Sequence, residues 1–204
     1  MDRRHIPNLL TGARIVFAIA VFLGLALAAG MIPGQTGRPG PSAQRAVCLW
    51  SLGAFVLAAV TDYFDGWLAR RWNAQSPWGA MLDPIADKIA VCGVVVGLAA
   101  LQPRGAIVVA GGIILFRELF VSGLREVGGA RGLKFPVTKL AKWKTTVQLV
   151  ALTLELLVAG LADRGMLRLV ADGLLWLAAA ITLWTGWEYA AAARRGLAEP
   201  PKAA

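Results

Sequence analysis

The 204-residue sequence is poor in charged residues and in cysteine. Only 16% of its residues are Asp, Glu, Lys or Arg, against roughly 25% in soluble globular domains. The two cysteines, Cys48 and Cys92, lie inside apolar runs without a partner motif, so we expect both to be inert packing residues. Internal repeats, linkers and a soluble segment are also lacking, and we therefore expect a single domain over residues 1–204.

The scarcity of charge is matched by apolar runs long enough to cross a bilayer. The first run, 9–29, is too long for a typical cleaved signal peptide and lacks a convincing cleavage site, so we expect a membrane helix there. We expect six membrane helices, over residues 8–29, 45–71, 79–101, 104–126, 141–161 and 167–192. The segments 32–42 and 128–139 are rich in glycine and are predicted loops. The sequence therefore predicts an all-α integral membrane protein.

The basic residues lie mainly between these runs, although the net charge is +9. In a soluble protein this charge would suggest nucleic acid, but here it indicates membrane topology and contact with lipid headgroups, and we expect no nucleic acid. Six helices put both termini on one side, and that side carries most of the Lys and Arg, in 3–4, 70–71, 125–144 and 194–202. From this excess we expect both termini in the cytoplasm, and we expect the protein in the cell (inner) membrane. Trp184, Trp187 and Tyr189 are a predicted interfacial aromatic belt.

Four aspartates stand out among the twelve acidic residues. Asp62 and Asp65 are three apart and share a helix face, and Asp83 and Asp87, four apart, share a face of the next helix. Each would cost roughly 2.5–3.5 kcal/mol at the centre of a membrane helix, and together they repel one another. Hard divalent cations relieve both problems because they prefer carboxylate oxygen, and two such ions can clamp a phosphoryl transfer. The pattern predicts a polar, metal-containing cavity that opens to the cytoplasm.

The residues between the aspartates fit a phosphate ligand. Gly66 and Ala69 leave room on the aspartate face of the helix, and Arg70 has the fork geometry that binds phosphate. Asp83, just before Pro84 at a predicted helix start, would by itself be an ordinary N-terminal residue. Four aspartates on two adjacent faces favour a functional site over four separate structural roles.

On this pattern the sequence resembles the CDP-alcohol phosphatidyltransferase family. The motif Asp-x2-Asp-Gly-x2-Ala-Arg-x8-Gly-x3-Asp-x3-Asp is matched by Asp62, Asp65, Gly66, Ala69, Arg70, Gly79, Asp83 and Asp87. The resemblance implies two Mg²⁺ or Mn²⁺ ions, both bridged by Asp62 and Asp83, with Asp65 on one ion and Asp87 on the other. It also implies that Asp87 is the base that deprotonates the acceptor alcohol, that CDP-diacylglycerol is the donor, and that the protein is a homodimer among membrane lipids. The implied contacts to the CDP-lipid are Asn8, Thr11, Gly66, Ala69, Arg70 and Ser76.

Cations on the next two predicted helices indicate the acceptor. Arg117 and Arg125 lie eight apart on roughly one face, and Lys142 and Lys144 begin the following helix. They predict a pocket for an acceptor that carries a phosphate, although the lysines could serve topology alone and Arg117 could simply pair with Glu118.

The segments 6–11, 117–126, 142–148 and 183–187 resemble family members that use glycerol 3-phosphate, with departures at Ala141 and in 128–136. Phosphatidylglycerol, serine and inositol phosphate remain alternative acceptors within the family. A cation transporter is the alternative from another class, but it would not need Gly66, Ala69 and Arg70 at these offsets.

The charge distribution predicts the topology. In a variant without the native cysteines, a cysteine at Lys134 should react only with membrane-permeant thiol reagents in intact cells, whereas one at Gln35 should also react with impermeant reagents. Labelling of residue 134 from outside would contradict the count of six helices.

Overall fold

The computed structural model describes residues 6–71, 77–132, 139–162 and 165–198, and these ranges contain helices and no strand. The elements are α1 (Ile6–Ala28), α2 (Pro41–Arg71), α3 (Pro77–Leu101), η1 (Ala106–Ala110), α4 (Gly111–Ala130), α5 (Lys139–Leu161) and α6 (Met166–Ala198). The π-helical turn η1 leads directly into α4, so the two form one continuous helix. Six helices are long and apolar enough to cross a membrane. The prediction of an all-α, multi-pass membrane protein is confirmed.

Several predicted boundaries were wrong. Helix α2 begins at Pro41, inside the predicted loop 32–42, because the first helical position needs no backbone N–H donor and suits proline. Helix α4 continues through the glycines to Ala130 and α5 begins at Lys139, so the predicted loop 128–139 is too long at both ends. Pro84 is internal to α3, and Asp83 therefore lies well inside that helix and not at its start.

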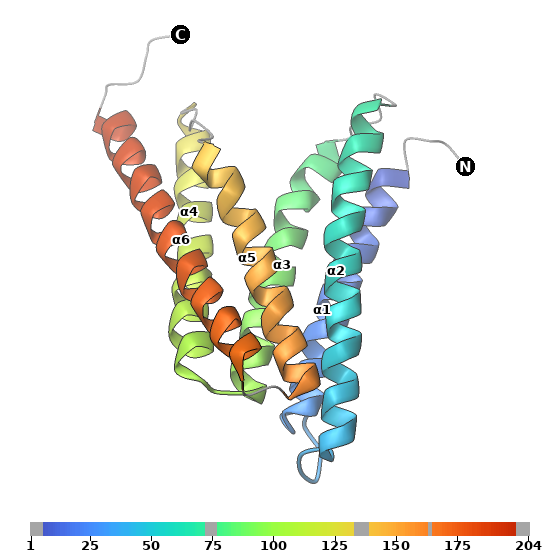
Figure 1. Ribbon diagram of the computed structural model, residues 1–204. Helices are drawn as coiled ribbons and strands as arrows, with labels where there is room; N and C mark the ends of the chain where they lie inside the picture. The colour runs from blue at the N-terminus through green and yellow to red at the C-terminus, as the bar shows by residue number, and fades with distance from the viewer. Residues whose placement is uncertain (1–5, 72–76, 133–138, 163–164, 199–204) are drawn as a thin grey trace.

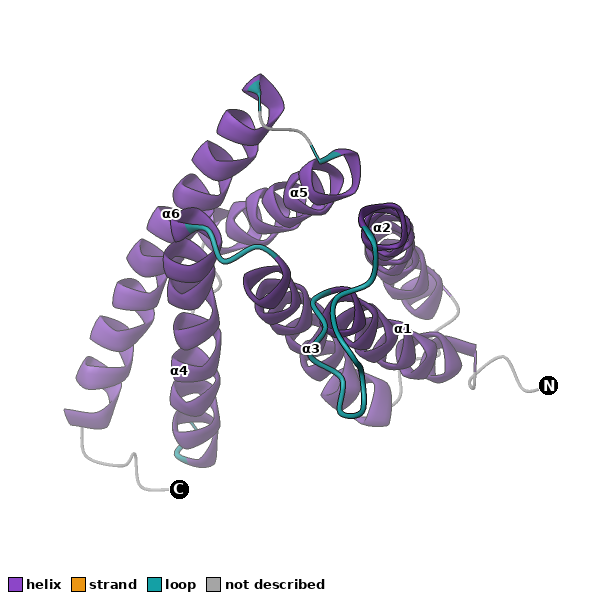
Figure 2. Cartoon of the chain, turned by 90° about the horizontal axis from the view of Figure 1, so that it is seen from below, coloured by secondary structure: helices purple, strands orange, loops and turns teal. Residues whose placement is uncertain are grey.

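The helices form two groups of three (Figure 1). Helix α1 packs along α2 and α3, helix α6 packs along α4 and α5, and α2 joins the groups by packing on α5. Helix α3 lies towards the centre, with contacts to α1, α4, α5 and η1 (Figure 2). The groups spread apart at the end where α1, α3 and α5 begin, which we call the open end (Figure 1).

The apolar core lies towards the opposite, closed end. Its fully buried members include Leu25, Leu98, Ile114, Leu156 and Leu175, each in the half of its helix that is remote from the open end. Helices α1 and α3 approach closely there, because a Cβ added to Gly97 would lie 2.7 Å from the Cβ of Leu25. Tight packing at the closed end leaves the open end available for polar side chains.

An ion cluster at the closed end ties three segments together. Arg104, in the connection before η1, donates to Asp172 of α6 at 2.5 Å and pairs with Glu155 of α5, whose side chain is 0% exposed. Arg168 lies at the edge of the cluster, 3.9 Å from Asp172. A buried carboxylate without its cation would be strongly destabilising, so Arg104 holds this end of α5 and α6 in place.

The cluster predicts unequal stability effects for its two arginines. Arg104→Ala should destabilise the protein by roughly 3–5 kcal/mol, because it leaves buried Glu155 unpaired. Arg168→Ala, the matched control, removes a half-exposed pair within one helix and should cost about 0.5 kcal/mol or less. Thermal unfolding of both variants in detergent measures the difference, and equal losses would contradict a special role for Arg104.

Candidate active site

Three of the four predicted aspartates are described with their side chains, and two of them converge on one arginine. Asp62 lies on α2, and Asp83 and Asp87 lie on α3. The side chain of Arg14, on α1, is 2% exposed; its Nη1 pairs with Asp62 and lies 3.4 Å from Oδ1 of Asp87. Carboxylates from two helices thus reach the same nitrogen, which shows that the aspartates of α2 and α3 face a common point.

Helix α1 also reaches the third aspartate. Oγ1 of Thr11 donates a hydrogen bond of 2.8 Å to Oδ1 of Asp83. Thr11 and Arg14 are three residues apart, so one face of α1 serves the aspartates of both neighbouring helices. Thr11 was predicted as a nucleotide contact, but Arg14 was missed. The signal was available, because Arg14 is the one charged residue inside the apolar run 9–28 and such a residue is costly unless paired.

The remaining predicted donor-site residues are described only in part. Asn8 lies on α1, and Asp65, Gly66, Ala69 and Arg70 lie on α2, but their side chains are outside the described part of the structure, as is all of Ser76. Among the described side chains, no group of three His, Cys, Asp or Glu could hold a metal ion. The described donors are carboxylate oxygens, which suit Mg²⁺ and Mn²⁺. The four-aspartate metal site therefore stays a prediction with a suitable donor set.

Next to the aspartates is a polar cavity of about 180 Å³. Its charged wall residues are Asp87, Lys88, Arg117, Glu118, Arg125 and Lys144. The structure thus brings three of the four predicted acceptor-site cations together with Asp87, while the side chain of Lys142 lies outside the described part. Four cations face two carboxylates, and the wall carries an excess of two positive charges. Such a wall suits an anion.

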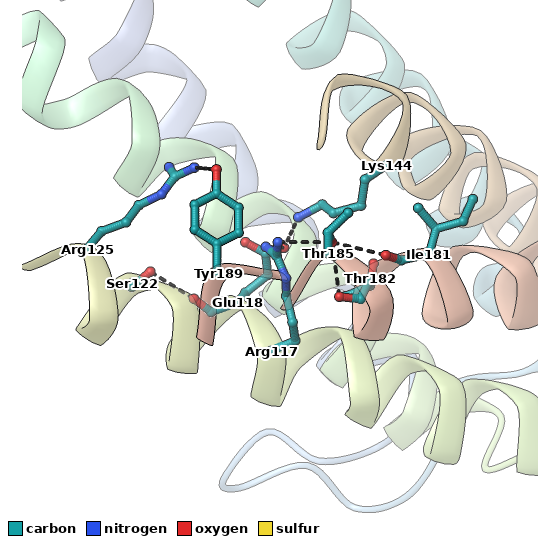
Figure 3. A network of polar contacts seen from close by, with 9 residues as sticks. All are labelled: Arg117, Glu118, Ser122, Arg125, Lys144, Ile181, Thr182, Thr185 and Tyr189. Atoms are coloured by element: carbon teal, nitrogen blue, oxygen red, sulfur yellow. Dashed lines mark hydrogen bonds and ion pairs between the residues drawn. The ribbon is translucent and has the colours of Figure 1, made fainter. Parts of the chain in front are cut away.

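Glu118 holds two of the cations (Figure 3). It pairs with Lys144 of α5 and lies 3.3 Å from Nη1 of Arg117, while Nη2 of Arg117 donates to Oγ1 of Thr185 at 3.1 Å. Arg117 thus pairs with Glu118, as the predicted alternative requires, and it also lines the cavity, as the predicted acceptor site requires. The pairing fixes Arg117 and Lys144 from different helices at one place in the wall.

Tyr189 positions the third cation (Figure 3). Its hydroxyl accepts a hydrogen bond of 2.6 Å from Nη2 of Arg125, whose guanidinium carbon lies 4.9 Å from the ring centroid. Tyr189 is 5% exposed, so its predicted place in a lipid-facing belt is wrong, whereas Trp184 and Trp187 are 62% and 73% exposed. The signal was its spacing: Tyr189 is one turn from buried Thr185 and shares its face.

A smaller pocket of about 60 Å³ adjoins the first and is mainly apolar. It is lined by Arg14 and Asp62 and by the small side chains Ala58, Ala59 and Ala90. Asp87, Val91 and Thr145 belong to the walls of both pockets. Asp87 therefore lies where a cationic compartment meets an apolar one, an arrangement suited to joining a polar anion to a lipid.

The family model that matches the chain is that of the CDP-alcohol phosphatidyltransferases, over residues 4–184. The chain belongs to this family of transferases. A protein of Cereibacter sphaeroides is 42% identical to this phosphatidyltransferase over 177 residues, covering 69% of this chain and 79% of its own. One of Rickettsia felis is 36% identical over 196 residues, 94% and 97% of the two chains. Both relatives are named "CDP-diacylglycerol--glycerol-3-phosphate 3-phosphatidyltransferase".

Proposed function

We propose that this phosphatidyltransferase is a phosphatidylglycerophosphate synthase. It transfers the phosphatidyl group of CDP-diacylglycerol to sn-glycerol 3-phosphate and releases CMP, a step in the synthesis of phosphatidylglycerol and cardiolipin. The observation that carries the proposal is the cavity in which Arg117, Arg125 and Lys144 share a wall with Asp87. The names of the relatives support the same reaction.

The cation cavity fits the acceptor of this reaction. Glycerol 3-phosphate carries a phosphate dianion, and the wall has an excess of two positive charges. Arginine binds phosphate through two parallel hydrogen bonds and lysine through a point charge. In our proposal Arg117, Arg125, Lys142 and Lys144 hold the acceptor phosphate, which leaves the far hydroxyl of the acceptor to reach Asp87.

The aspartates fit the donor side. Asp62, Asp65, Asp83 and Asp87 would hold two Mg²⁺ or Mn²⁺ ions, and the convergence of Asp62 and Asp87 on one nitrogen of Arg14 supports this. When bound, such ions neutralise the diphosphate and the charge that develops on the leaving CMP. Asn8, Thr11, Gly66, Ala69, Arg70 and Ser76 are the proposed contacts to the CDP-lipid.

Asp87 is the proposed general base. It takes the proton of the acceptor hydroxyl when that oxygen comes within hydrogen-bond reach. The oxygen then bonds to the phosphorus attached to diacylglycerol, and the bond from that phosphorus to the CMP oxygen breaks. We further propose one domain over residues 1–204, a homodimer, and insertion in the inner membrane with both termini in the cytoplasm.

The aspartates should separate in their effects on binding and turnover. Asp87→Asn should lower kcat far more than the affinity for CDP-diacylglycerol, because it removes the base, whereas Asp62→Asn should weaken Mn²⁺ and nucleotide binding together. Steady-state kinetics measure kcat, and electron paramagnetic resonance measures Mn²⁺ binding. Near-normal kcat of Asp87→Asn would refute the base assignment. For the wild type, excess chelator should abolish turnover.

The acceptor cations should affect one substrate only. Lys144→Ala and Arg117→Ala should each raise KM for glycerol 3-phosphate about 10- to 100-fold, the effect of losing one charge-assisted hydrogen bond, and leave KM for CDP-diacylglycerol nearly unchanged. The matched control is Arg131→Ala, which removes an exposed cation at the end of α4. If Arg117→Ala does not fold, Arg117→Lys can replace it in the test, because lysine keeps the positive charge.

An assay of the wild-type protein with four acceptors tests the acceptor itself. Turnover should be fastest with glycerol 3-phosphate and slow with phosphatidylglycerol, serine and inositol phosphate. A preference for any of these three would refute the acceptor while leaving the reaction class intact.

A further inference from the structure

Gln148 is a buried amide in the wall of the cation cavity, and its amide oxygen has no protein partner among the described residues. Its side chain lies on α5 and the residue is 3% exposed. Oε1 accepts no hydrogen bond within the described ranges. Arg117, Lys144 and Tyr189, the other buried polar residues of the wall, each contact a neighbour in the network of Figure 3, although Nε of Arg117 also has no partner in the described ranges. An unpartnered buried amide oxygen is unfavourable in a folded protein, and a ligand that supplies a donor would satisfy it.

The position of Gln148 suits a ligand that stretches from the cations to Asp87. Gln148 follows Lys144 by one turn on the same face of α5, about 6 Å further along the helix axis. Helix α5 runs inward from the open end (Figure 1), so Gln148, which follows Lys144 in sequence, lies further from that end. Asp87 and Val91 of α3 line the same cavity. A molecule with its phosphate at the cations and its reacting hydroxyl at Asp87 would occupy the cavity whose wall includes Gln148.

The chemistry of the Gln148 amide indicates which group of the ligand it would bind. Charged groups in the wall suit the phosphate and the proton transfer, whereas a primary amide suits a neutral hydroxyl, because it offers one acceptor and two donors. A half-turn about the Cγ–Cδ bond exchanges oxygen and nitrogen, so either atom can take the place of the other. One hydroxyl can then donate to Oε1 or accept from Nε2.

We propose that Gln148 is a specificity-determining residue that binds the second hydroxyl of the acceptor, on the carbon between the phosphate-bearing and the reacting carbons. The inference rests on the proposed function and deepens it, since it defines the acceptor class as phosphorylated polyols with a free internal hydroxyl. An acceptor without this hydroxyl leaves the amide buried and unsatisfied, and a site built around a hydrogen bond rejects such an analogue.

The test compares glycerol 3-phosphate with 3-hydroxypropyl phosphate, which keeps the phosphate and the primary hydroxyl but lacks the internal one. The full-length protein in detergent micelles with CDP-diacylglycerol should prefer glycerol 3-phosphate by about 10- to 100-fold in kcat/KM, the effect of one hydrogen bond in a buried site. Gln148→Met has similar length and no hydrogen-bonding group, and it should bring the ratio close to one by losing activity on glycerol 3-phosphate alone. Thr146→Met, at an exposed position of the same helix, should keep the wild-type ratio.

The possible outcomes distinguish a failure of the proposed role of Gln148 from a failure of the proposed function. If the wild type prefers glycerol 3-phosphate and Gln148→Met keeps that preference, the hydroxyl is bound elsewhere and only the role of Gln148 is overturned. If the wild type uses glycerol 3-phosphate and 3-hydroxypropyl phosphate equally well, the role of Gln148 is overturned while the proposed function stands. If the wild type uses neither substrate, both the role of Gln148 and the proposed function are overturned. Gln148→Asn retains the amide but withdraws it by one carbon, so it should lower the ratio even where the methionine variant does not fold.

Discussion

Carboxylates inside a membrane helix bundle need positive partners, and this requirement organises the open end of the molecule. Asp62 and Asp87 come from different helices, and Arg14 of α1 pairs with both. Without a cation between them, the repulsion of the carboxylates and their desolvation would drive α2 and α3 apart. Helix α1 packs along both helices and supplies this charge, so its role is electrostatic as well as apolar.

In the neighbouring cation cavity the charges are reversed, because buried cations there are held by a carboxylate. Arg117 and Lys144 are nearly buried cations from two helices, and Glu118 lies between them. Thr185 and Tyr189 of α6 complete the set with neutral oxygen acceptors for the arginines. Each helix of the second group therefore contributes to holding the cations, and an excess of positive charge remains at a cavity that contains Asp87. The cation cavity and the smaller apolar pocket share one carboxylate, Asp87, on the central helix.

The sequence predicted the fold well because the bilayer restricts the choice. Backbone groups in lipid must be paired within a helix, so an apolar run of sufficient length allows little else. The predicted loops wrongly included Pro41 and Gly128, which belong to helices α2 and α4. Proline is tolerated in the first turn of a helix, and glycine is tolerated in the last turn when packing favours the helix. The aspartate motif and the cations could be found from spacing, but partners such as Arg14 with Asp62 and Tyr189 with Arg125 are distant in sequence. Only the packing of the helices brings them together.

The concentration of fully buried leucines towards the closed end has a consequence for how such a protein can diverge. Leu25, Leu98 and Leu156, with the Arg104 cluster, secure the closed end. By contrast, Ser122 and Gln148, which line the cation cavity, lie in the halves of their helices nearer the open end. Substitutions of neutral wall residues near the open end therefore remove few of the contacts that keep the bundle assembled. In the proposed acceptor site, wall residues such as Gln148 or Ser122 can change under selection for a new alcohol with little loss of folding stability. A bundle of this kind is a tolerant scaffold on which new headgroup preferences evolve by a few replacements.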